Sequence, residues 1–249
     1  MTIKVNFVIG GAQKGGTSAL DTYLRGHPSI LMAKHKELHF FDKESHFSAS
    51  PVDYAAYHAN FDSGLVNSRL LGESTPIYMY WYPAPRRIWE YNSEMKWILI
   101  LRNPIERAFS NWNMERICGR EHLPFIEAIF SERERCRSAL PVQHRYCSYI
   151  DRGFYTEQIR RIWHFFPKEQ TLFLKSEELN DHPNCTLGKV CSFLGIEQLH
   201  TQSDERIHVG QYTSRLSEEE REQLIKLFEI EIHVLEKLLG WDCSSWLKK

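Results

Sequence analysis

One stretch near the N-terminus, residues 7–20, constrains the fold more than any other part of the chain. It reads FVIGGAQKGGTSAL. The apolar, β-branched start is typical of a buried strand, and the helical pattern that follows the glycines ends before Gly26 and Pro28. Glycines let backbone N–H groups approach an anion, and a helix dipole favours negative charge at the helix N-terminus. The stretch therefore predicts a phosphate-binding loop.

The lysine of this loop does not stand where nucleoside triphosphate-binding loops have theirs. Their motif, G-x-x-x-x-G-K-[ST], places lysine directly before the hydroxyl residue. Here Gly16 holds that place, and Lys14 precedes both glycines. Lys14 adds a mobile positive charge, and Thr17 and Ser18 add hydroxyl donors. A glycine turn that only closes a strand–helix unit remains the alternative at this point.

Strands and helices alternate along the rest of the chain. Apolar runs predict strands at residues 29–33, 70–76, 96–101 and 171–174. Helical periodicity predicts helices at residues 84–91, 105–116, 125–135, 155–166, 187–194 and 218–239, the last of them preceded by a capping box. The alternation implies an α/β, P-loop-type fold with a central parallel sheet flanked by helices. Because no linker or repeat interrupts it, we expect a single domain over residues 1–249.

Composition excludes several classes of function. The 249 residues carry a formal charge of −1, which gives no general attraction to nucleic acid or to an anionic membrane. No segment approaches the roughly 20 apolar residues that cross a bilayer, and the N-terminus runs into the first strand, so we expect a cytoplasmic protein. The six cysteines lack C-x-x-C spacing, which favours free thiols and no metal site. The sequence indicates no oligomeric state.

A second motif, RNPIERAFS at residues 102–110, follows the strongest predicted strand directly. Ligands of open α/β sheets bind beyond the carboxyl ends of the strands, which is where Arg102 emerges. A guanidinium group suits a phosphate through its fork of donors. Ser110 follows two helical turns later. The alternative is an arginine that caps a helix and a serine on a solvent-facing surface.

A third motif, KELHFFD, occupies residues 36–42. A partly desolvated carboxylate near lysines can remove a proton from an alcohol, which makes Glu37 a candidate general base. The alternative is a surface ion-pair loop anchored by Phe40 and Phe41. We prefer core anchoring for the two phenylalanines and catalysis for Glu37.

Together the three motifs resemble a known enzyme family. Residues 13–18 resemble the 5′-phosphosulfate loop of sulfotransferases that use 3′-phosphoadenosine 5′-phosphosulfate (PAPS), and Arg102 with Ser110 resembles their 3′-phosphate site. Residues 36–42 resemble the K-E-x-H-F-F-D segment of heparan sulfate sulfotransferases and of their soluble bacterial relatives. The resemblance implies in-line transfer of a sulfuryl group from PAPS to a hydroxyl of a small molecule, lipid, polyketide or sugar. It implies PAP as the product and no metal.

The resemblance also implies roles for individual residues. Glu37 is the general base, Lys14 offsets charge on the leaving oxygen, and backbone N–H groups of residues 15–19 hold the 5′-phosphate. The predicted cofactor-binding residues are Lys14, Gly15, Gly16, Thr17, Ser18, Ala19, Arg102 and Ser110. The predicted catalytic residues are Glu37, Lys14 and His39, and the residues predicted to bind the acceptor are Lys36, Asp42, Glu73 and Ser74.

One family feature is missing. Relatives carry a late Lys-Gly or Arg-Lys-Gly phosphate clamp, and residues 207–214, at the corresponding place, have none. His208, Tyr212 or Arg215 are candidates to replace it. Because the sequence also lacks the secretory anchor of Golgi enzymes, it favours a bacterial-type enzyme acting on a smaller hydroxyl compound. Two rivals remain: a Mg²⁺-dependent P-loop kinase or NTPase, and a non-catalytic nucleotide-binding protein.

Two further groups have interpretations of their own. Arg86 and Arg87 are adjacent cations, for which we predict a solvated basic surface in preference to acceptor binding. Tyr149 and Tyr155 stand in a segment that resembles the family's stretch before a core helix, and they are predicted either to pack in the core or to contact adenine.

Overall fold

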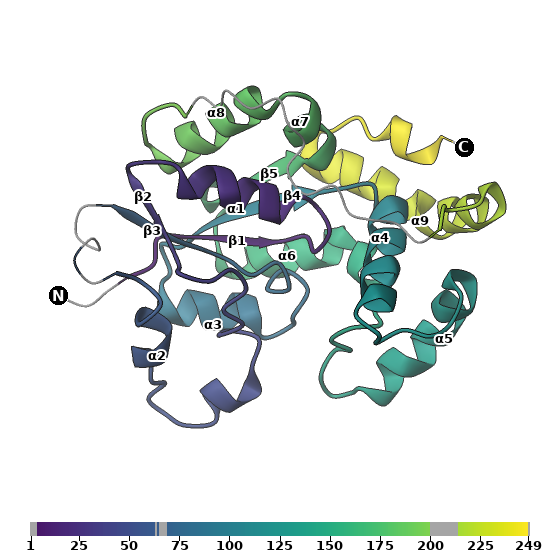
Figure 1. Cartoon of the computed structure of the whole chain (residues 1–249), viewed down its shortest axis with the longest axis horizontal. Helices are drawn as coiled ribbons and strands as arrows, with labels where there is room; N and C mark the ends of the chain where they lie inside the picture. Colours follow the sequence, from purple (N-terminus) through teal and green to yellow (C-terminus); the bar gives the residue numbers. More distant parts are fainter. Residues whose placement is uncertain (1–3, 63, 65–68, 200–213, 249) are drawn as a thin grey trace. The chain divides into compact units, whose positions relative to one another are not determined.

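The computed structural model describes residues 4–62, 64, 69–199 and 214–248 (Figure 1). The chain divides into two compact units. The first unit combines Met1–Leu101 with Arg161–His208, and the second combines Arg102–Arg160 with Val209–Lys249. The single domain over residues 1–249 stays a prediction.

A five-stranded sheet forms the centre of the first unit, with all of its strand pairs parallel and in the order β2-β3-β1-β4-β5. The strands are β1 (Phe7–Gly11), β2 (Ile30–Met32), β3 (Leu70–Ser74), β4 (Lys96–Leu101) and β5 (Thr171–Lys175). In the register, Ile9 of β1 lies opposite Ser74 of β3 on one side and Ile98 of β4 on the other. The predicted central parallel sheet is confirmed.

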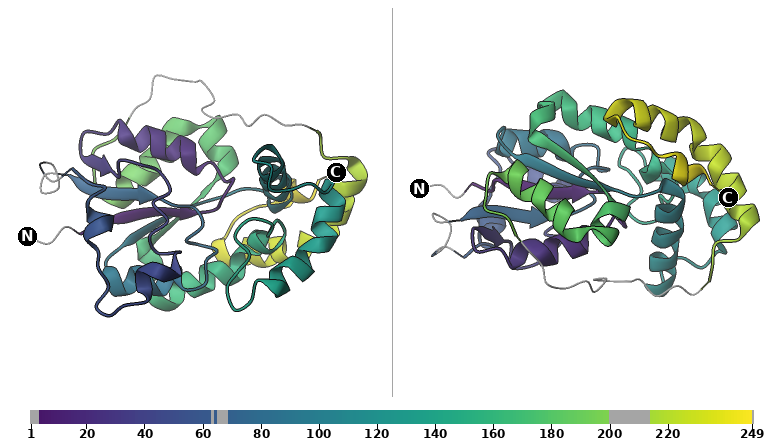
Figure 2. Two further views of the ribbon diagram at one scale, coloured as in Figure 1. Left: turned by 60° about the horizontal axis from the view of Figure 1, so that its bottom comes forward. Right: turned by 90° about the horizontal axis from the view of Figure 1, so that it is seen from above.

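Helices flank both faces of this sheet. They are α1 (Thr17–Arg25), η1 (Glu44–Phe47), α2 (Ala55–His58), α3 (Ala84–Tyr91), η3 (Lys168–Gln170), α7 (Ser176–Asp181) and α8 (Pro183–Leu194), and α6 (Tyr155–Phe165) begins in the second unit and ends in the first. In Figure 1 and in the left view of Figure 2, α1 and α8 lie on one side of the sheet and α2 and α3 on the other.

The two faces of the sheet have different cores. On the side of α1 and α8 the core is aliphatic, with buried Ile9, Leu20, Ile98, Leu187 and Val190 in one cluster. A run of neighbouring aromatic rings joins the 36–42 segment to α2 and α3, made of Phe40, Phe41, Tyr57, Tyr78 and Tyr91. The aromatic cluster anchors the KELHFFD motif.

The second unit is helical. It contains α4 (Pro104–Ile117), α5 (Phe125–Ser138), η2 (Asp151–Gly153), α9 (Glu218–Leu239) and η4 (Ser244–Leu247). The Asn103 side chain caps α4 by accepting from the N–H of Ile105, and Ser217 with Glu220 forms the predicted capping box of α9. No helix of the described residues is both long and apolar enough to cross a membrane.

The two helices that directly follow β5 differ from the sequence prediction. The helix predicted over residues 187–194 begins earlier, at Pro183. Proline suits a first helical turn because the N–H that it lacks would have no intrahelical acceptor there. The short helix α7 was not predicted. Its six residues present too few turns for a helical period to be visible.

Candidate functional site

The predicted phosphate loop packs its backbone directly against β4. The N–H of Ala12 donates to the carbonyl of Ile100 at 2.9 Å, and the N–H of Gly15 donates to the carbonyl of Ala12 at 2.9 Å. A Cβ on Gly15 would lie 2.2 Å from the oxygen of Ile100, a backbone atom that cannot turn aside. Gly16 has a φ of 108°, which other residues rarely adopt. Both positions therefore require glycine.

The loop leads directly into α1, whose N-terminus has no side-chain cap. Gly16 is the N-cap residue, and its carbonyl accepts from the N–H groups of Ala19 and Leu20 at 3.1 and 3.3 Å. The first N–H groups of a helix, here those of Thr17 and Ser18, have no intrahelical acceptor. These donors and the positive end of the helix dipole form a cradle that fits an anion such as phosphate.

Strained backbone is concentrated at the residues predicted to be catalytic. Outside glycine, the described residues with φ in the left-handed region are Lys14, Glu37 and His39, with φ of 70°, 62° and 52°. Such a conformation costs an L-residue about 1–2 kcal/mol, and it persists only where the surroundings hold it. Since residues of this kind cluster at active sites, the coincidence supports a functional role for all three.

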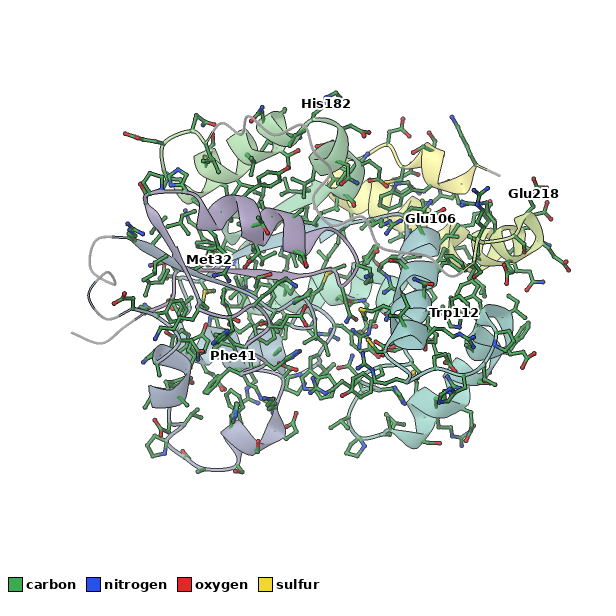
Figure 3. The ribbon with its side chains drawn as sticks, in the orientation of Figure 1. Met32, Phe41, Glu106, Trp112, His182 and Glu218 are labelled. Atoms are coloured by element: carbon green, nitrogen blue, oxygen red, sulfur yellow. The ribbon has the colours of Figure 1, made fainter. Side chains whose placement is uncertain are left out.

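The 36–42 segment is attached to the carboxyl end of β3. The N–H of Glu37 donates to the carbonyl of Ser74 at 2.8 Å, and Ser74 pairs with Ile9 in β1, the strand that leads into the phosphate loop. Phe40 and Phe41 are 3% and 0% exposed, in agreement with the core role preferred for them (Phe41 is labelled in Figure 3). The backbone of Glu37 therefore lies one strand away from β1.

A line of alternating charges runs through this segment. Nζ of Lys36 lies 2.7 Å from Oε1 of Glu37, Nε2 of His39 lies 3.5 Å from Oε2 of Glu37, and Nδ1 of His39 lies 2.9 Å from Oδ2 of Asp42. The side chain of Glu37 is 40% exposed, whereas that of Asp42 is fully buried. Of the two carboxylates, Glu37 is accordingly the one that solvent or an acceptor can reach.

The neighbours set the charge of this line at neutral pH. The hydrogen bond with His39, supported by the charge of Lys36, lowers the pKa of Glu37 to about 2 against the effect of burial. Hydrogen bonds to Asp42 and Glu37 raise the pKa of His39 to about 9. Glu37 is therefore a carboxylate and His39 an imidazolium. This arrangement provides a proton acceptor that is ionised and oriented, though weakened by its two cationic partners.

Glu73, predicted to bind the acceptor, is 0% exposed and lies in the interior next to the 36–42 segment. Its Oε1 accepts from the hydroxyl of Tyr57 at 2.8 Å, and its Oε2 accepts from the hydroxyls of Thr75 and Tyr78 at 2.8 and 3.3 Å. The same Tyr78 hydroxyl accepts from the N–H of Phe40 at 3.1 Å. Ser74 is also buried, at 1% exposure. Glu73 thus holds the Tyr78 hydroxyl that in turn binds the backbone of the motif.

We expect the charge of Glu73 to make stability depend on pH. Burial raises its pKa from 4.5 to about 7, so the folded chain keeps a proton that the unfolded chain loses. Stability therefore falls as pH rises from 4.5 to 7, by up to about 3 kcal/mol from this group. Glu73→Gln, which resembles the protonated form, should reduce this fall in urea denaturation at pH 5 and pH 8.

The exposed variant Glu178→Gln is the matched control for this measurement, since that carboxylate lies on the surface of α7. Glu132, the other buried carboxyl whose pKa is raised to about 7, remains in both variants, so part of the fall persists. Equal pH dependence in Glu73→Gln and wild type would contradict the assignment.

Arg87 corrects one sequence prediction. The predicted solvated surface is right for Arg86, whose side chain is 69% exposed, and wrong for Arg87, which is 9% exposed. Arg87 donates from Nη1 to the carbonyl of Phe41 at 2.9 Å, pairs with Glu44, and lies 4.3 Å over the ring of Phe47. Successive helix residues point about 100° apart, so adjacent arginines face different surroundings.

The residues of the RNPIERAFS motif lie at and near the start of α4 in the second unit. Nη2 of Arg102 is 3.9 Å from Oε2 of Glu106, and Ser110 is 5% exposed. Glu106, labelled in Figure 3, also pairs with Arg221 of α9. Neither Glu106 nor Arg221 was predicted from the sequence. Spacing four residues after Arg102 could have suggested Glu106, but no local pattern points to Arg221.

The tyrosines considered for adenine contact are core residues. Tyr149 and Tyr155 are both 0% exposed. The hydroxyl of Tyr149 donates to Glu121 at 2.9 Å, and that of Tyr155 donates to the carbonyl of Arg102 at 2.9 Å. Tyr155 therefore fixes the backbone of the predicted phosphate-binding arginine from the interior.

Of the three candidates to replace the late phosphate clamp, the structure describes Arg215. His208 and Tyr212 lie outside the described residues, and Arg215 is exposed. Within the described part of the chain, no three His, Cys, Asp or Glu side chains gather into a group that could hold a metal ion. The predicted independence from metal stays a prediction.

Comparison with known proteins identifies the family. A model of the sulfotransferase domain matches residues 4–231. The chain belongs to the sulfotransferase family. This sulfotransferase is similar to human heparan sulfate glucosamine 3-O-sulfotransferase 3B1, with 30% identity over 194 residues, which cover 78% of this chain and 47% of that protein. The chain therefore spans about half the length of the curated relatives it matches.

Solved structures support the same assignment. A sulfotransferase from Alicyclobacillus acidocaldarius is similar at a TM-score of 0.84 and 29% identity, covering 99% of this sulfotransferase and all of that chain. The sulfotransferase domain from the curacin biosynthetic pathway, at a TM-score of 0.52 and 17% identity over 79% of this chain, shares the fold. The family predicted from the three motifs and the fold predicted from the alternation of strands and helices are confirmed.

Proposed function

We propose that this sulfotransferase transfers the sulfuryl group of PAPS to a hydroxyl group of an acceptor and releases PAP. A bond forms between the acceptor oxygen and sulfur, the bond from sulfur to the phosphate-bridging oxygen breaks, and the hydroxyl proton passes to Glu37. The observation that carries the proposal is the ionised and partly exposed Glu37, held by Lys36 and His39 within a family-matched chain.

Each predicted group has a task in this reaction. The cradle at the start of α1 suits the 5′-phosphate, and Lys14 would offset the negative charge that develops on the leaving oxygen. Arg102 and Ser110 would bind the 3′-phosphate. His39, held by the buried Asp42 at 2.9 Å, keeps the Glu37 carboxylate oriented. Positioning and charge stabilisation would supply most of the rate gain, as they do in phosphoryl transfer.

The acceptor is proposed only as a class. The human relative is named for its action on a glucosamine of heparan sulfate, and the curacin domain belongs to a biosynthetic pathway. An alcohol of a sugar, lipid, polyketide or other small molecule fits a carboxylate base equally well. Acceptor preference in such folds is set by variable segments around the site, and the sequence ranges predicted to have this role are 43–69 and 117–147. A cytoplasmic, bacterial-type enzyme stays a prediction.

Calorimetric titration with PAP, ADP and ATP, with and without Mg²⁺, tests the proposal. We expect PAP to bind more tightly than either competitor because it alone carries a 3′-phosphate, and we expect this preference to be independent of Mg²⁺. The preference should be lost in Arg102→Ala. Tighter binding of ATP in the presence of Mg²⁺ would contradict the proposal and favour a P-loop kinase or NTPase.

A further inference from the structure

The second unit contains an ion-pair cluster of three residues that brings α9 to the predicted phosphate-binding motif. Glu106 pairs with Arg221 of α9, and its Oε2 lies 3.9 Å from Nη2 of Arg102. The side chains of Arg102, Glu106 and Arg221 are 26%, 33% and 24% exposed. All three are therefore open to a ligand. At 3.9 Å, the contact between Arg102 and Glu106 is too long to use up the donors of that guanidinium group.

The position of Glu106 on α4 determines where Arg221 lies. Glu106 stands four residues after Arg102 and four before Ser110. Residues four apart in a helix share a face, so Glu106 and Ser110 are neighbours on α4. Glu106 also belongs to the first turn of α4, where the positive end of the helix dipole favours anions. Arg221, held by Glu106, therefore lies beside the face of α4 that carries Ser110, and Glu106 also lies 3.9 Å from Arg102, which precedes the helix.

The charges show why Arg221 matters for an anion at this place. With Arg102 and Glu106 alone, the carboxylate would cancel the guanidinium charge, and a phosphate dianion would meet a pair of no net charge. Adding Arg221 leaves one net positive charge in the cluster. Its planar fork can also give a phosphate two parallel hydrogen bonds, which a single lysine cannot.

We infer that Arg221 supplies the second guanidinium group of the 3′-phosphate site, with Arg102 as the first. The inference rests on the proposed function, since it assigns one more residue to the same nucleotide. It also accounts for the missing late clamp of this sulfotransferase: the second cation comes from helix α9 instead of from residues 207–214. Glu106 is a positioning residue that holds Arg221 in place until a phosphate is bound.

The test is calorimetric titration of PAP and of AMP, which is PAP without its 3′-phosphate. Arg221→Met keeps much of the apolar stem and removes the charge, and Lys226→Met removes an exposed charge from the same helix as a control. We expect Arg221→Met to weaken PAP binding by about 10- to 100-fold, the range for losing a charge-assisted pair, and to leave AMP binding unchanged. Lys226→Met should leave both unchanged.

The outcomes separate the inference about Arg221 from the proposed function. If wild type prefers PAP to AMP and Arg221→Met keeps the full preference, the inference about Arg221 is overturned and the proposed function stands. Equal loss of PAP and AMP binding in Arg221→Met overturns it too, since that is the effect of a structural residue. If wild type binds PAP no better than AMP, the proposed function itself is wrong. Should Arg221→Met unfold, Arg221→Lys, which keeps the charge but not the fork, should lose part of the preference.

Discussion

Glu37→Gln should lower kcat/KM for sulfuryl transfer by about 10²- to 10⁴-fold, the contribution of a positioned general base. Glutamine has nearly the same shape as glutamate but cannot take the proton of the acceptor hydroxyl. Because the Glu37 side chain is 40% exposed and outside the core, the fold should not change. Binding of PAP should also be unchanged, since the carboxylate is assigned to the acceptor and not to the nucleotide.

The measurement is turnover of PAPS with the best acceptor from a panel of phenols, alcohols and sugars, together with calorimetric binding of PAP. Glu90→Gln is the control, because Glu90 is an exposed, ion-paired carboxylate of the same unit. Activity in Glu37→Gln equal to that of Glu90→Gln would remove Glu37 from the mechanism. It would leave the nucleotide assignment intact.

The pH profile gives an independent test of the same group. With a pKa of about 2 for Glu37 and about 9 for His39, both stay charged across the neutral range. The acid limb of kcat/KM should therefore lie well below pH 4.5 in wild type. His39→Asn removes the main cause of the lowered pKa of Glu37, so its acid limb should move upward, toward pH 4.5. An unchanged acid limb would show that His39 does not tune Glu37.

The same charges affect stability in opposite directions. The lowered pKa of Glu37 stabilises the fold above pH 4.5, and this contribution is lost as pH falls through 2. The raised pKa of His39 stabilises the fold below pH 6.5, and that contribution is lost as pH rises through 9. Glu37 and His39 are therefore both charged from mildly acidic to mildly basic pH, the range in which the proposed reaction requires an ionised Glu37.

The sequence could predict those features that local patterns encode. Residues 7–20 combine a β-branched run, glycines and a helical period, and the structure has β1, a loop that only glycine fits, and α1 at that place. The capping box at Ser217 and Glu220 could also be predicted, because each side chain accepts a hydrogen bond from the backbone of the other residue within one helical turn. Parallel pairing followed from the alternation of strands and helices.

Features that depend on distant residues could not be predicted in this way. Arg87 and its neighbour Arg86 are the same residue type on one helix, and only the packing of the 41–47 segment decides that Arg87 is buried. Arg221 stands 115 residues from Glu106, and no sequence pattern links the two. The acceptor role of Glu73 stays a prediction, and its three buried hydroxyl partners come from Tyr57, Thr75 and Tyr78, a set that no local pattern predicts. Long-range pairing is decided by tertiary structure.

Lys14→Gly should separate catalysis from folding at the phosphate loop. We expect kcat/KM to fall by about 10²- to 10³-fold, the typical effect of removing one group that stabilises developing charge. Stability should change little, since Lys14 has a φ of 70°. Glycine adopts this conformation without the strain of about 1–2 kcal/mol that an L-residue carries, which offsets its greater entropy in the unfolded chain.

Turnover of PAPS and thermal unfolding of the same preparations measure the two effects. Lys189→Ala, which removes an exposed cation from α8, controls for a general change of charge. The charge that Lys14 offsets is larger on the leaving group than on bound PAPS, so its loss should lower kcat more than it raises KM for PAPS. A variant that folds like wild type and raises only KM would make Lys14 a binding residue without a part in the chemical step.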